Sequence, residues 1–255
     1  MTAAQTSNCA RFADRPIAEG GTPSSAWRGW SRDIEPLDLQ RCPALILVAP
    51  HPDDETLGFG ATAASLRMRG VPVTIVVASD GGGAYPGLSP VERRWLERDR
   101  HAETQRAVGI LGLGTPIWLG LPDGELADHE RELADVITGC LEAAPAGAWC
   151  AATWRGDGHP DHEAVGRSAA AACARTSATL LEYPIWMWHW AEPDDADVPW
   201  ETMRRPAVDP GCAARKRDAA QAFRTQLTPH EPGADPILPP FVMQRLMGVG
   251  EAVFL

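Results

Sequence analysis

A histidine and three carboxylates lie within five residues, in the segment His51-Pro52-Asp53-Asp54-Glu55. Carboxylates this close repel one another unless a proton or a cation is shared among them. A divalent metal ion is the simplest source of that positive charge, and histidine and carboxylate side chains are common ligands of such ions. This segment therefore predicts a metal site.

A second polar cluster, His159-Pro160-Asp161-His162, lies further along the chain. If the two clusters meet, His51, Asp54 and His162 supply two imidazoles and one carboxylate. This ligand set is typical of catalytic zinc, with an open position for water, and equally of mononuclear iron. Asp53 would then lie beside a metal-bound water as a general base, and His159 would stabilise an oxyanion or protonate a leaving amine.

Each cluster follows a predicted strand and precedes a predicted helix. The apolar run 44–48 has the length of a strand, and apolar residues recur at a helical period from Leu57 to Met68 before Gly70. In an open parallel sheet, ligands bind at the carboxyl ends of the strands, so we expect both clusters to face one crevice.

The alternation of strands and helices along the chain predicts an α/β fold. We expect a Rossmann-like open, mostly parallel sheet with helices on both faces and the active site at the carboxyl ends of the strands. The predicted strands cover residues 44–48, 73–78, 117–121, 149–154, 179–186 and 251–255. The predicted helices cover residues 57–68, 92–111, 126–141, 163–175 and 213–227, with a loop at 191–210.

The N-terminal residues differ in composition from the remainder of the chain. Residues 1–25 are small and polar, with interspersed Gly and Pro, which predicts a disordered or surface-bound segment that residues 26–30 pin to the body. We therefore divide the chain into an arm, residues 1–42, draped on the body, and a single α/β domain, residues 43–255.

Composition excludes several classes of partner. The net charge of −11 argues against a nucleic acid or an anionic membrane. Six cysteines without a C-x-x-C pair predict buried free thiols in a reducing compartment. Residues 1–20 contain no apolar core of a secretory signal, and no apolar run has the length of a membrane span, so we expect a cytoplasmic protein.

The two clusters together, in this order and spacing, resemble the paired signature of the LmbE-like, or PIG-L, family of zinc-dependent de-N-acetylases. The resemblance covers residues 43–185 and includes Arg100-His101-Ala102-Glu103 and Leu121-Pro122-Asp123-Gly124. It implies a Zn²⁺-dependent hydrolase that acts on a C–N bond other than a peptide bond. The implied reaction removes an N-acyl group, foremost N-acetyl, from an amino sugar such as GlcNAc or from a related metabolite.

The resemblance also implies a role for each residue of the two motifs. Asp53 becomes the general base that activates a zinc-bound water, and His159 becomes the group that stabilises the oxyanion. Asp161 would tune His159, and Glu55 would support the site. The implied zinc ligands are His51, Asp54 and His162.

Three further residues are predicted to contact the substrate. By the resemblance, Asp123 falls where family members touch a sugar hydroxyl, and Arg94 falls near a substrate contact of the mycothiol branch. That branch has a tyrosine where this chain has Asp157, which disfavours a mycothiol precursor as substrate and favours another branch. The substrate's identity stays open, and a specialised enzyme of natural-product biosynthesis fits the arm and the tryptophan segment described next.

The segment Trp186-Met187-Trp188-His189-Trp190 is unusually rich in aromatic residues. If the strand before it continues, alternation places three indoles on one face. Core packing, the interface of a homo-oligomer and a substrate wall are three interpretations of such a face. Two other segments have plainer interpretations: Gly81-Gly82-Gly83 as a mobile rim of the active site, and Arg215-Lys216-Arg217 as a solvated helix face.

Two competing functions remain open from the sequence. An Fe(II) 2-His-1-carboxylate oxygenase would use the same ligands, although the α/β alternation is not the β-helix that such enzymes usually adopt. A non-catalytic, metal-binding family member is the other alternative. The presence of all five candidate metal and catalytic residues in the chain favours an enzyme over this alternative.

Overall fold

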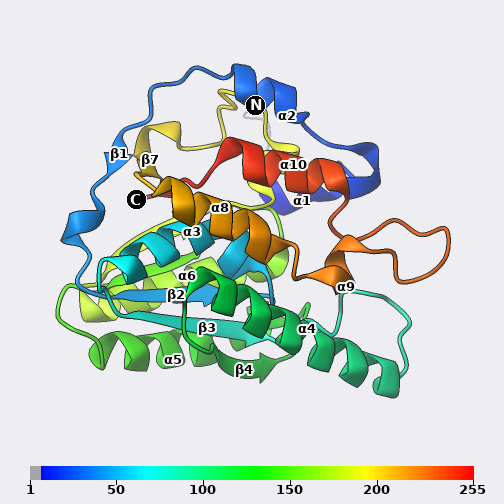
Figure 1. The fold of residues 1–255 in the computed structure, drawn as a ribbon, viewed down its shortest axis with the longest axis horizontal. Coiled ribbons are helices and arrows are strands. Elements are labelled where there is room, and N and C mark those ends of the chain that lie inside the picture. Colours follow the sequence, from blue (N-terminus) through cyan, green and yellow to red (C-terminus); the bar gives the residue numbers. More distant parts are fainter. Residues whose placement is uncertain (1–6) are drawn as a thin grey trace, which may run out of the picture.

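Eight strands of the described residues form one mixed, mostly parallel sheet, which confirms the predicted α/β fold (Figure 1). A computed structural model describes residues 7–255, so the expectation for residues 1–6 lies outside it. The strand order is β1-β7-β8-β6-β5-β2-β3-β4, and β8 runs antiparallel to its neighbours β6 and β7. The strands are β1 (Pro36–Leu37), β2 (Leu45–Ala49), β3 (Val73–Ser79), β4 (Ile117–Leu121), β5 (Trp149–Thr153), β6 (Thr179–Tyr183), β7 (Met203–Pro206) and β8 (Val253–Phe254).

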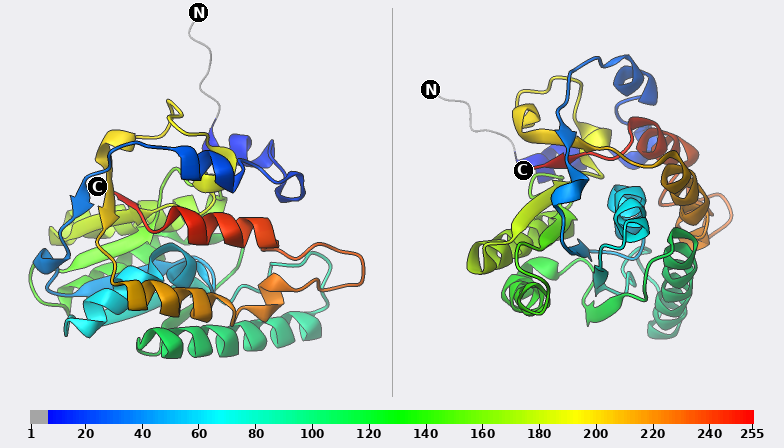
Figure 2. Two further views of the ribbon diagram at one scale, coloured as in Figure 1. Left: turned by 45° about the horizontal axis from the view of Figure 1, so that its top comes forward. Right: turned by 60° about the vertical axis from the view of Figure 1, so that its left-hand side comes forward.

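The central strand β2 explains why helices cover both faces of the sheet. All five of its residues are buried, and successive side chains of a strand point to opposite faces. Leu45 and Leu47 join one apolar cluster, whereas Ile46 and Val48 join a second cluster on the other face. Helices α3 (Asp54–Met68), α4 (Pro90–Leu111), α8 (Pro210–Ala220) and α10 (Pro240–Val249) contribute to the first cluster, and α5 (Glu130–Glu142) and α6 (Pro160–Thr176) contribute to the second. Figures 1 and 2 show α5 and α8 on opposite sides of the sheet.

The helices begin and end at residues that suit those positions. Ser89 and Glu92 form a capping box at the start of α4, and Gly112, with φ 73°, ends it. The longer helices are α3 (Asp54–Met68), α4 (Pro90–Leu111), α5 (Glu130–Glu142), α6 (Pro160–Thr176), α8 (Pro210–Ala220) and α10 (Pro240–Val249). The shorter ones are α1 (Asn8–Ala13), α2 (Ser24–Gly29), α7 (Met187–Trp190) and α9 (Arg224–Leu227), with 3₁₀ turns at Ile17–Glu19, Leu39–Arg41, Leu126–His129 and Trp200–Thr202.

The predicted strand 179–186 is shorter in the structure, and it does not continue through Trp186–Trp190, so alternation along a strand does not place the three indoles. Strand β6 ends at Tyr183, and the chain turns into α7. The cause is Asp157, whose carboxylate accepts hydrogen bonds from the backbone N–H groups of Ile185, Trp186 and Met187. Because these donors are taken by a side chain, they do not pair with a neighbouring strand. The indoles of Trp188 and Trp190 are consequently part of the core.

The N-terminal residues described by the structure include two helices. Trp27 of α2 is buried and donates from Nε1 to the carbonyl oxygen of Trp188 at 2.9 Å, and Trp30 packs on Trp200 at 4.7 Å between ring centroids. In Figure 2 the α2 helix lies on the same side of the sheet as α10. The division into an arm and a single domain stays a prediction.

The C-terminal part also departs from the expectation. The predicted helix 213–227 is divided into α8 and α9, the predicted loop 191–210 contains β7, and α10 has no counterpart in the prediction. Lys216 is buried rather than solvated, and its Nζ pairs with Glu251 Oε1 at 2.8 Å, which compensates the buried charge. Glu251 also accepts the backbone N–H groups of Ala61 and Thr62 and so ties the C-terminus to α3.

All six cysteines are free, and Cys9 and Cys140 are only half-buried. Among the described residues, no helix is both long and apolar enough to cross a membrane.

We expect Gly58→Ala to destabilise the fold. A Cβ at Gly58 would overlap the ring of Tyr183, which is fully buried and held by a hydrogen bond from its hydroxyl to the carbonyl oxygen of Val48. Overpacking of this kind lowers the free energy of unfolding by about 1–3 kcal/mol. The matched control is Gly109→Ala, in a helix with open space around the new methyl group, which should stabilise by about 0.5–1 kcal/mol. Equal effects of the two substitutions in urea unfolding would contradict this packing.

Candidate active site

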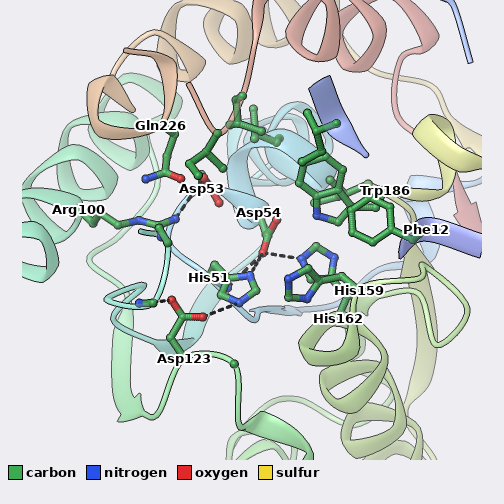
Figure 3. A pocket seen from close by; sticks show the side chains of 18 residues that line it. Phe12, His51, Asp53, Asp54, Arg100, Asp123, His159, His162, Trp186 and Gln226 are labelled. Atoms are coloured by element: carbon green, nitrogen blue, oxygen red, sulfur yellow. Dashed lines mark hydrogen bonds and ion pairs between the residues drawn. The ribbon is translucent and has the colours of Figure 1, made fainter. Parts of the chain in front are cut away.

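The two polar clusters of the sequence meet at the carboxyl edge of the sheet. The first spans the turn after β2 and the first residues of α3, and the second spans His159, just before α6, and the first turn of that helix. Because β2 and β5 are parallel neighbours, paired from Leu45 opposite Trp149, their carboxyl ends lie side by side. Figure 3 shows the side chains of both clusters converging in one cavity.

The side chains of His51, Asp54 and His162 are arranged so that one metal ion could contact all three. One nitrogen or oxygen of each lies within 4.8 Å of the others. Asp54 Oδ2 lies 3.2 Å from His51 Nδ1 and 3.3 Å from His162 Nε2. His162 is almost completely buried, and apart from this 3.3 Å ion-pair contact with Asp54 its Nε2 has no hydrogen-bond partner within residues 7–255. An unpaired buried nitrogen that faces a carboxylate fits a metal ligand. One ligand atom from each of a second group of residues also lies within 4.8 Å of the others, and this group is His51, His159 and Asp161.

Asp157 holds His162 in place. Its Oδ2 lies 2.8 Å from His162 Nδ1, so Nδ1–H donates to the carboxylate and Nε2 keeps its lone pair for a metal. Asp157 is completely buried and is absent from the cavity lining. The predicted substrate contact at Asp157 is therefore corrected: this side chain positions a candidate ligand and the start of α7. A carboxylate five residues before the histidine is the only sequence signal of this role.

The electrostatics of the cluster explain its need for a cation. Burial disfavours the charged form of Asp54, but His162 and His51 outweigh it and hold the pKa of Asp54 below its ordinary value. Burial likewise opposes protonation of His162, but Asp54 and Asp157 raise its pKa to about 9. The pKa of His51 is also raised, against burial, by hydrogen bonds to Asp123, Asp161 and Asp54. The carboxylates thus attract positive charge, which a proton or a metal ion supplies.

Asp53 occupies a strained position next to these residues. Its φ of 137° lies in a region that residues other than glycine rarely adopt. The backbone N–H of Asp53 donates to Glu55 Oε2 at 3.0 Å, and its carbonyl oxygen accepts from the N–H of Leu57 at 2.8 Å. Burial raises the pKa of Asp53 to about 8, and the nearby Arg100 guanidinium opposes this shift. The turn therefore directs the Asp53 carboxyl into the cavity at the cost of backbone strain.

Arg100 is a supporting residue that the sequence analysis named only as part of a motif. It is buried in α4 and donates to the carbonyl oxygens of Gly81 and Pro52 at 3.0 and 2.8 Å. Its Nη2 lies 3.3 Å from Asp53 Oδ2. Arg100 thus joins the turn after β2 to the loop after β3, and the planar fork of its guanidinium makes all three contacts from Nη1 and Nη2.

We expect Arg100→Met to lower the free energy of unfolding by about 3 kcal/mol or more, because it leaves two buried carbonyl oxygens and a buried carboxyl without their donor. Arg98→Met is the matched control in the same helix: the Arg98 side chain is 71% exposed and contacts Asp99. Its effect should stay within about 0.5 kcal/mol. Urea unfolding of both variants measures the difference, and a loss as small for Arg100→Met as for Arg98→Met would refute the supporting role.

His159 lies beside the candidate ligands, and its ring centroid is 5.1 Å from that of His51 and 4.9 Å from that of His162. Its Nδ1 accepts the backbone N–H of Asp161 at 3.2 Å, so the neutral ring carries its proton on Nε2. Burial, together with the neighbouring His162 and His51, lowers the pKa of His159 to about 3. A neutral imidazole with a fixed N–H is a hydrogen-bond donor suited to an oxyanion.

Asp161 and Asp123 both contact His51. The Asp161 carboxylate accepts the backbone N–H of Gly124 at 2.7 Å and lies 3.1 Å from His51 Nε2. Its side chain therefore contacts His51, whereas only its backbone N–H contacts His159. Asp123 Oδ1 also lies 3.1 Å from His51 Nε2, and its Oδ2 accepts the N–H of Gly83. The predicted contact residue Arg94 is exposed on α4 and does not line the cavity.

The cavity has a volume of about 370 Å³ and is lined by polar and apolar side chains. The polar ones that are labelled in Figure 3 come from the turn after β2, the starts of α3 and α6, α4, the turn after β4 and α9. They are His51, Asp53, Asp54, Arg100, Asp123, His159, His162 and Gln226. Glu55 and Asp161 are buried and do not line the cavity.

Comparisons with known proteins agree with the motifs. The model of the family described as GlcNAc-PI de-N-acetylase (PIG-L) matches residues 46–173. The chain is 30% identical to the uncharacterized deacetylase YaiS of Escherichia coli over 54% of this chain and 72% of that protein. It is 33% identical to a 1D-myo-inositol 2-acetamido-2-deoxy-alpha-D-glucopyranoside deacetylase of Mycobacterium sp. over 64% of this chain, and it spans only 59% of that relative's length.

Solved structures share the fold. The N,N′-diacetylchitobiose deacetylase of Pyrococcus horikoshii has a TM-score of 0.57, 20% identity and 75% coverage of both chains. The conserved protein TT1542 of Thermus thermophilus has a TM-score of 0.53 and 27% identity over 71% of this chain and 79% of the other. The resemblance therefore extends beyond the residues that the family model matches.

Proposed function

Because this chain belongs to the PIG-L family of GlcNAc-PI de-N-acetylases, we propose that it is a metal-dependent deacetylase that hydrolyses the N-acetyl amide of a GlcNAc-type substrate. The observation that carries the proposal is the convergence of His51, Asp54 and His162 in one cavity with Asp53 and His159 beside them. Two imidazoles and one carboxylate leave an open position on a metal, which hydrolytic chemistry needs.

The proposed ligands of the metal are His51, Asp54 and His162, and the proposed ion is Zn²⁺. The Nε2 of His162, which makes no hydrogen bond and faces Asp54, and the carboxylates that draw positive charge to the site support this assignment. When bound, the ion would polarise the amide carbonyl and make water a better nucleophile near neutral pH.

Asp53 is the proposed general base. Its carboxylate would take the proton from the attacking water as the C–O bond forms. The turn fixes this carboxyl beside Asp54, and Arg100 holds one of its oxygens. The same proton, now on Asp53, would pass to the nitrogen as the C–N bond breaks, so that a free amine and acetate leave the site.

His159 is the proposed oxyanion donor. Its Nδ1 is occupied by the Asp161 N–H, which leaves the Nε2–H to bond the oxygen that gains charge during attack. Asp123 is the proposed contact to a sugar hydroxyl, because it lines the cavity next to His51.

A substrate screen tests the proposal. Purified protein is incubated with N-acetylated amino sugars and with N-acyl peptides, and released amine is measured with and without a chelator. We expect chelator-sensitive release from the amino sugars. Retained metal without release from any of them would instead indicate a non-catalytic metal-binding protein, and oxygen-dependent turnover would indicate an Fe(II) oxygenase.

A further inference from the structure

We propose that the cavity selects substrates that carry an apolar group next to the N-acyl amide, and that segments outside residues 46–173, the range that the family model matches, form most of the surface for that group. This inference rests on the proposed deacetylase function. The surface, called here the apolar wall, consists of Phe12, Ile17, Ile185, Trp186, Ile237 and Leu238.

Apart from Asp123, the proposed sugar contact, the cavity offers few polar side chains for sugar hydroxyls. Beyond the candidate metal and catalytic residues, its polar side chains are Arg100, Asp123 and Gln226. Arg100 donates to the carbonyl oxygens of Gly81 and Pro52, and Asp123 accepts from the N–H of Gly83. Gln226 donates from Nε2 to Thr225 Oγ1 at 3.1 Å. A substrate hydroxyl buried without a partner is costly, whereas an apolar group gains from the same surface.

The N-terminal part of the wall is built into the structure beside the proposed oxyanion donor. The Phe12 ring lies 5.1 Å from Trp186 and 6.4 Å from His159 between centroids, and Figure 3 shows Phe12 and Trp186 together next to His159. A Cβ at Gly158 would come within 2.9 Å of Phe12 Cβ, so α1 approaches this loop only because residue 158 is a glycine. Asn8 fastens the same helix by donating to the carbonyl oxygen of Gly156 at 2.8 Å.

The C-terminal part of the wall is equally fixed. Leu238 is buried and belongs to the core cluster, and Ile237 packs against it. The N–H of Leu238 donates to the carbonyl oxygen of Gln226 at 2.9 Å, which joins this segment to α9 at the cavity. The wall is therefore preorganised for an apolar group.

The wall residues and the proposed catalytic residues come from different parts of the sequence. The family model matches residues 46–173, which include every proposed ligand and catalytic residue. The six wall residues lie outside that range, whereas two further apolar residues that line the cavity, Leu57 and Ala84, lie within it. Residues 46–173 thus supply the proposed hydrolytic chemistry, and the flanking segments supply most of the apolar surface that would choose among N-acylated amines.

Two substrate series test the inference on the wild-type protein. One series lengthens the aglycone of GlcNAc from methyl to butyl and octyl, and the other lengthens the N-acyl group of the methyl glycoside from acetyl to butanoyl and octanoyl. We expect kcat/KM to rise by about fourfold for each methylene group that reaches the wall, in one of the two series. The series that responds identifies the side of the amide that faces the wall.

Substitutions in the wall supply the second readout. The double variant Phe12→Ala/Ile17→Ala should reduce the octyl-to-methyl ratio of kcat/KM in the responding series at least tenfold. The ratio within one enzyme does not depend on the folded fraction. Ile34→Ala is the matched control, because Ile34 is also half-buried in the N-terminal segment but does not line the cavity, and its ratio should match the wild type.

Failure of the apolar-wall inference and failure of the proposed function give different results. Hydrolysis of the methyl glycoside with no rise in either series contradicts the apolar wall and leaves the proposed function standing. A rise that survives the double variant also contradicts the wall. Hydrolysis of no member of either series contradicts the proposed function, and the inference falls with it.

Discussion

Asp53→Asn is expected to lower kcat by about 10²- to 10⁴-fold while the bound metal is retained. The amide cannot accept the proton of the attacking water, and Asp53 is not one of the three proposed ligands. Asparagine is the appropriate replacement because it tolerates the positive φ at this position better than alanine does. Metal content and steady-state kinetics of the purified variant measure the two effects separately.

Asp80→Asn is the control for this change. Asp80 follows the neighbouring strand β3 and contacts His101 at 2.8 Å, but it does not line the cavity. The same chemical change there should leave kcat near the wild-type value. Undiminished hydrolysis by Asp53→Asn would remove Asp53 from the role of base.

His162→Ala is expected to lose both the metal and about three orders of magnitude in kcat, since the ion's stabilisation of the transition state amounts to several kcal/mol. It differs from Asp53→Asn in that metal content falls together with turnover. His129→Ala is the matched control: His129 contacts Glu132 on the surface and lies outside the cavity. A His162→Ala protein that keeps its full metal content would show that another group, such as His51, His159 and Asp161, binds the ion.

The elements that carry the candidate site could be predicted from the sequence because their signals are local. The apolar run before His51 and the helical period after it define a strand–turn–helix unit without reference to the remaining chain. The same holds for β5 and α6 around the second cluster. The rule that ligands bind at the carboxyl ends of parallel strands then predicted that the two clusters meet.

The residues that support the site could not be predicted, because their roles depend on contacts between distant segments. From the sequence, Asp157 is predicted to lie in a loop. In the fold its carboxylate contacts His162 and accepts three backbone N–H groups, which are then not available to pair with a neighbouring strand. Phe12 lies in a segment whose composition suggested disorder, and only its packing on Trp186 brings it to the cavity. Arg100 joins two loops from a helix whose surface is mostly charged.

The most direct test of the account is an anomalous-scattering map from crystals of the wild-type protein grown with zinc. We predict one strong peak at about 2.0–2.2 Å from a ring nitrogen of His51, a ring nitrogen of His162 and a carboxylate oxygen of Asp54. Asp53 and His159 should lie beside the peak without binding it. A peak bound instead by His51, His159 and Asp161, or no peak in the cavity, would contradict the central claim.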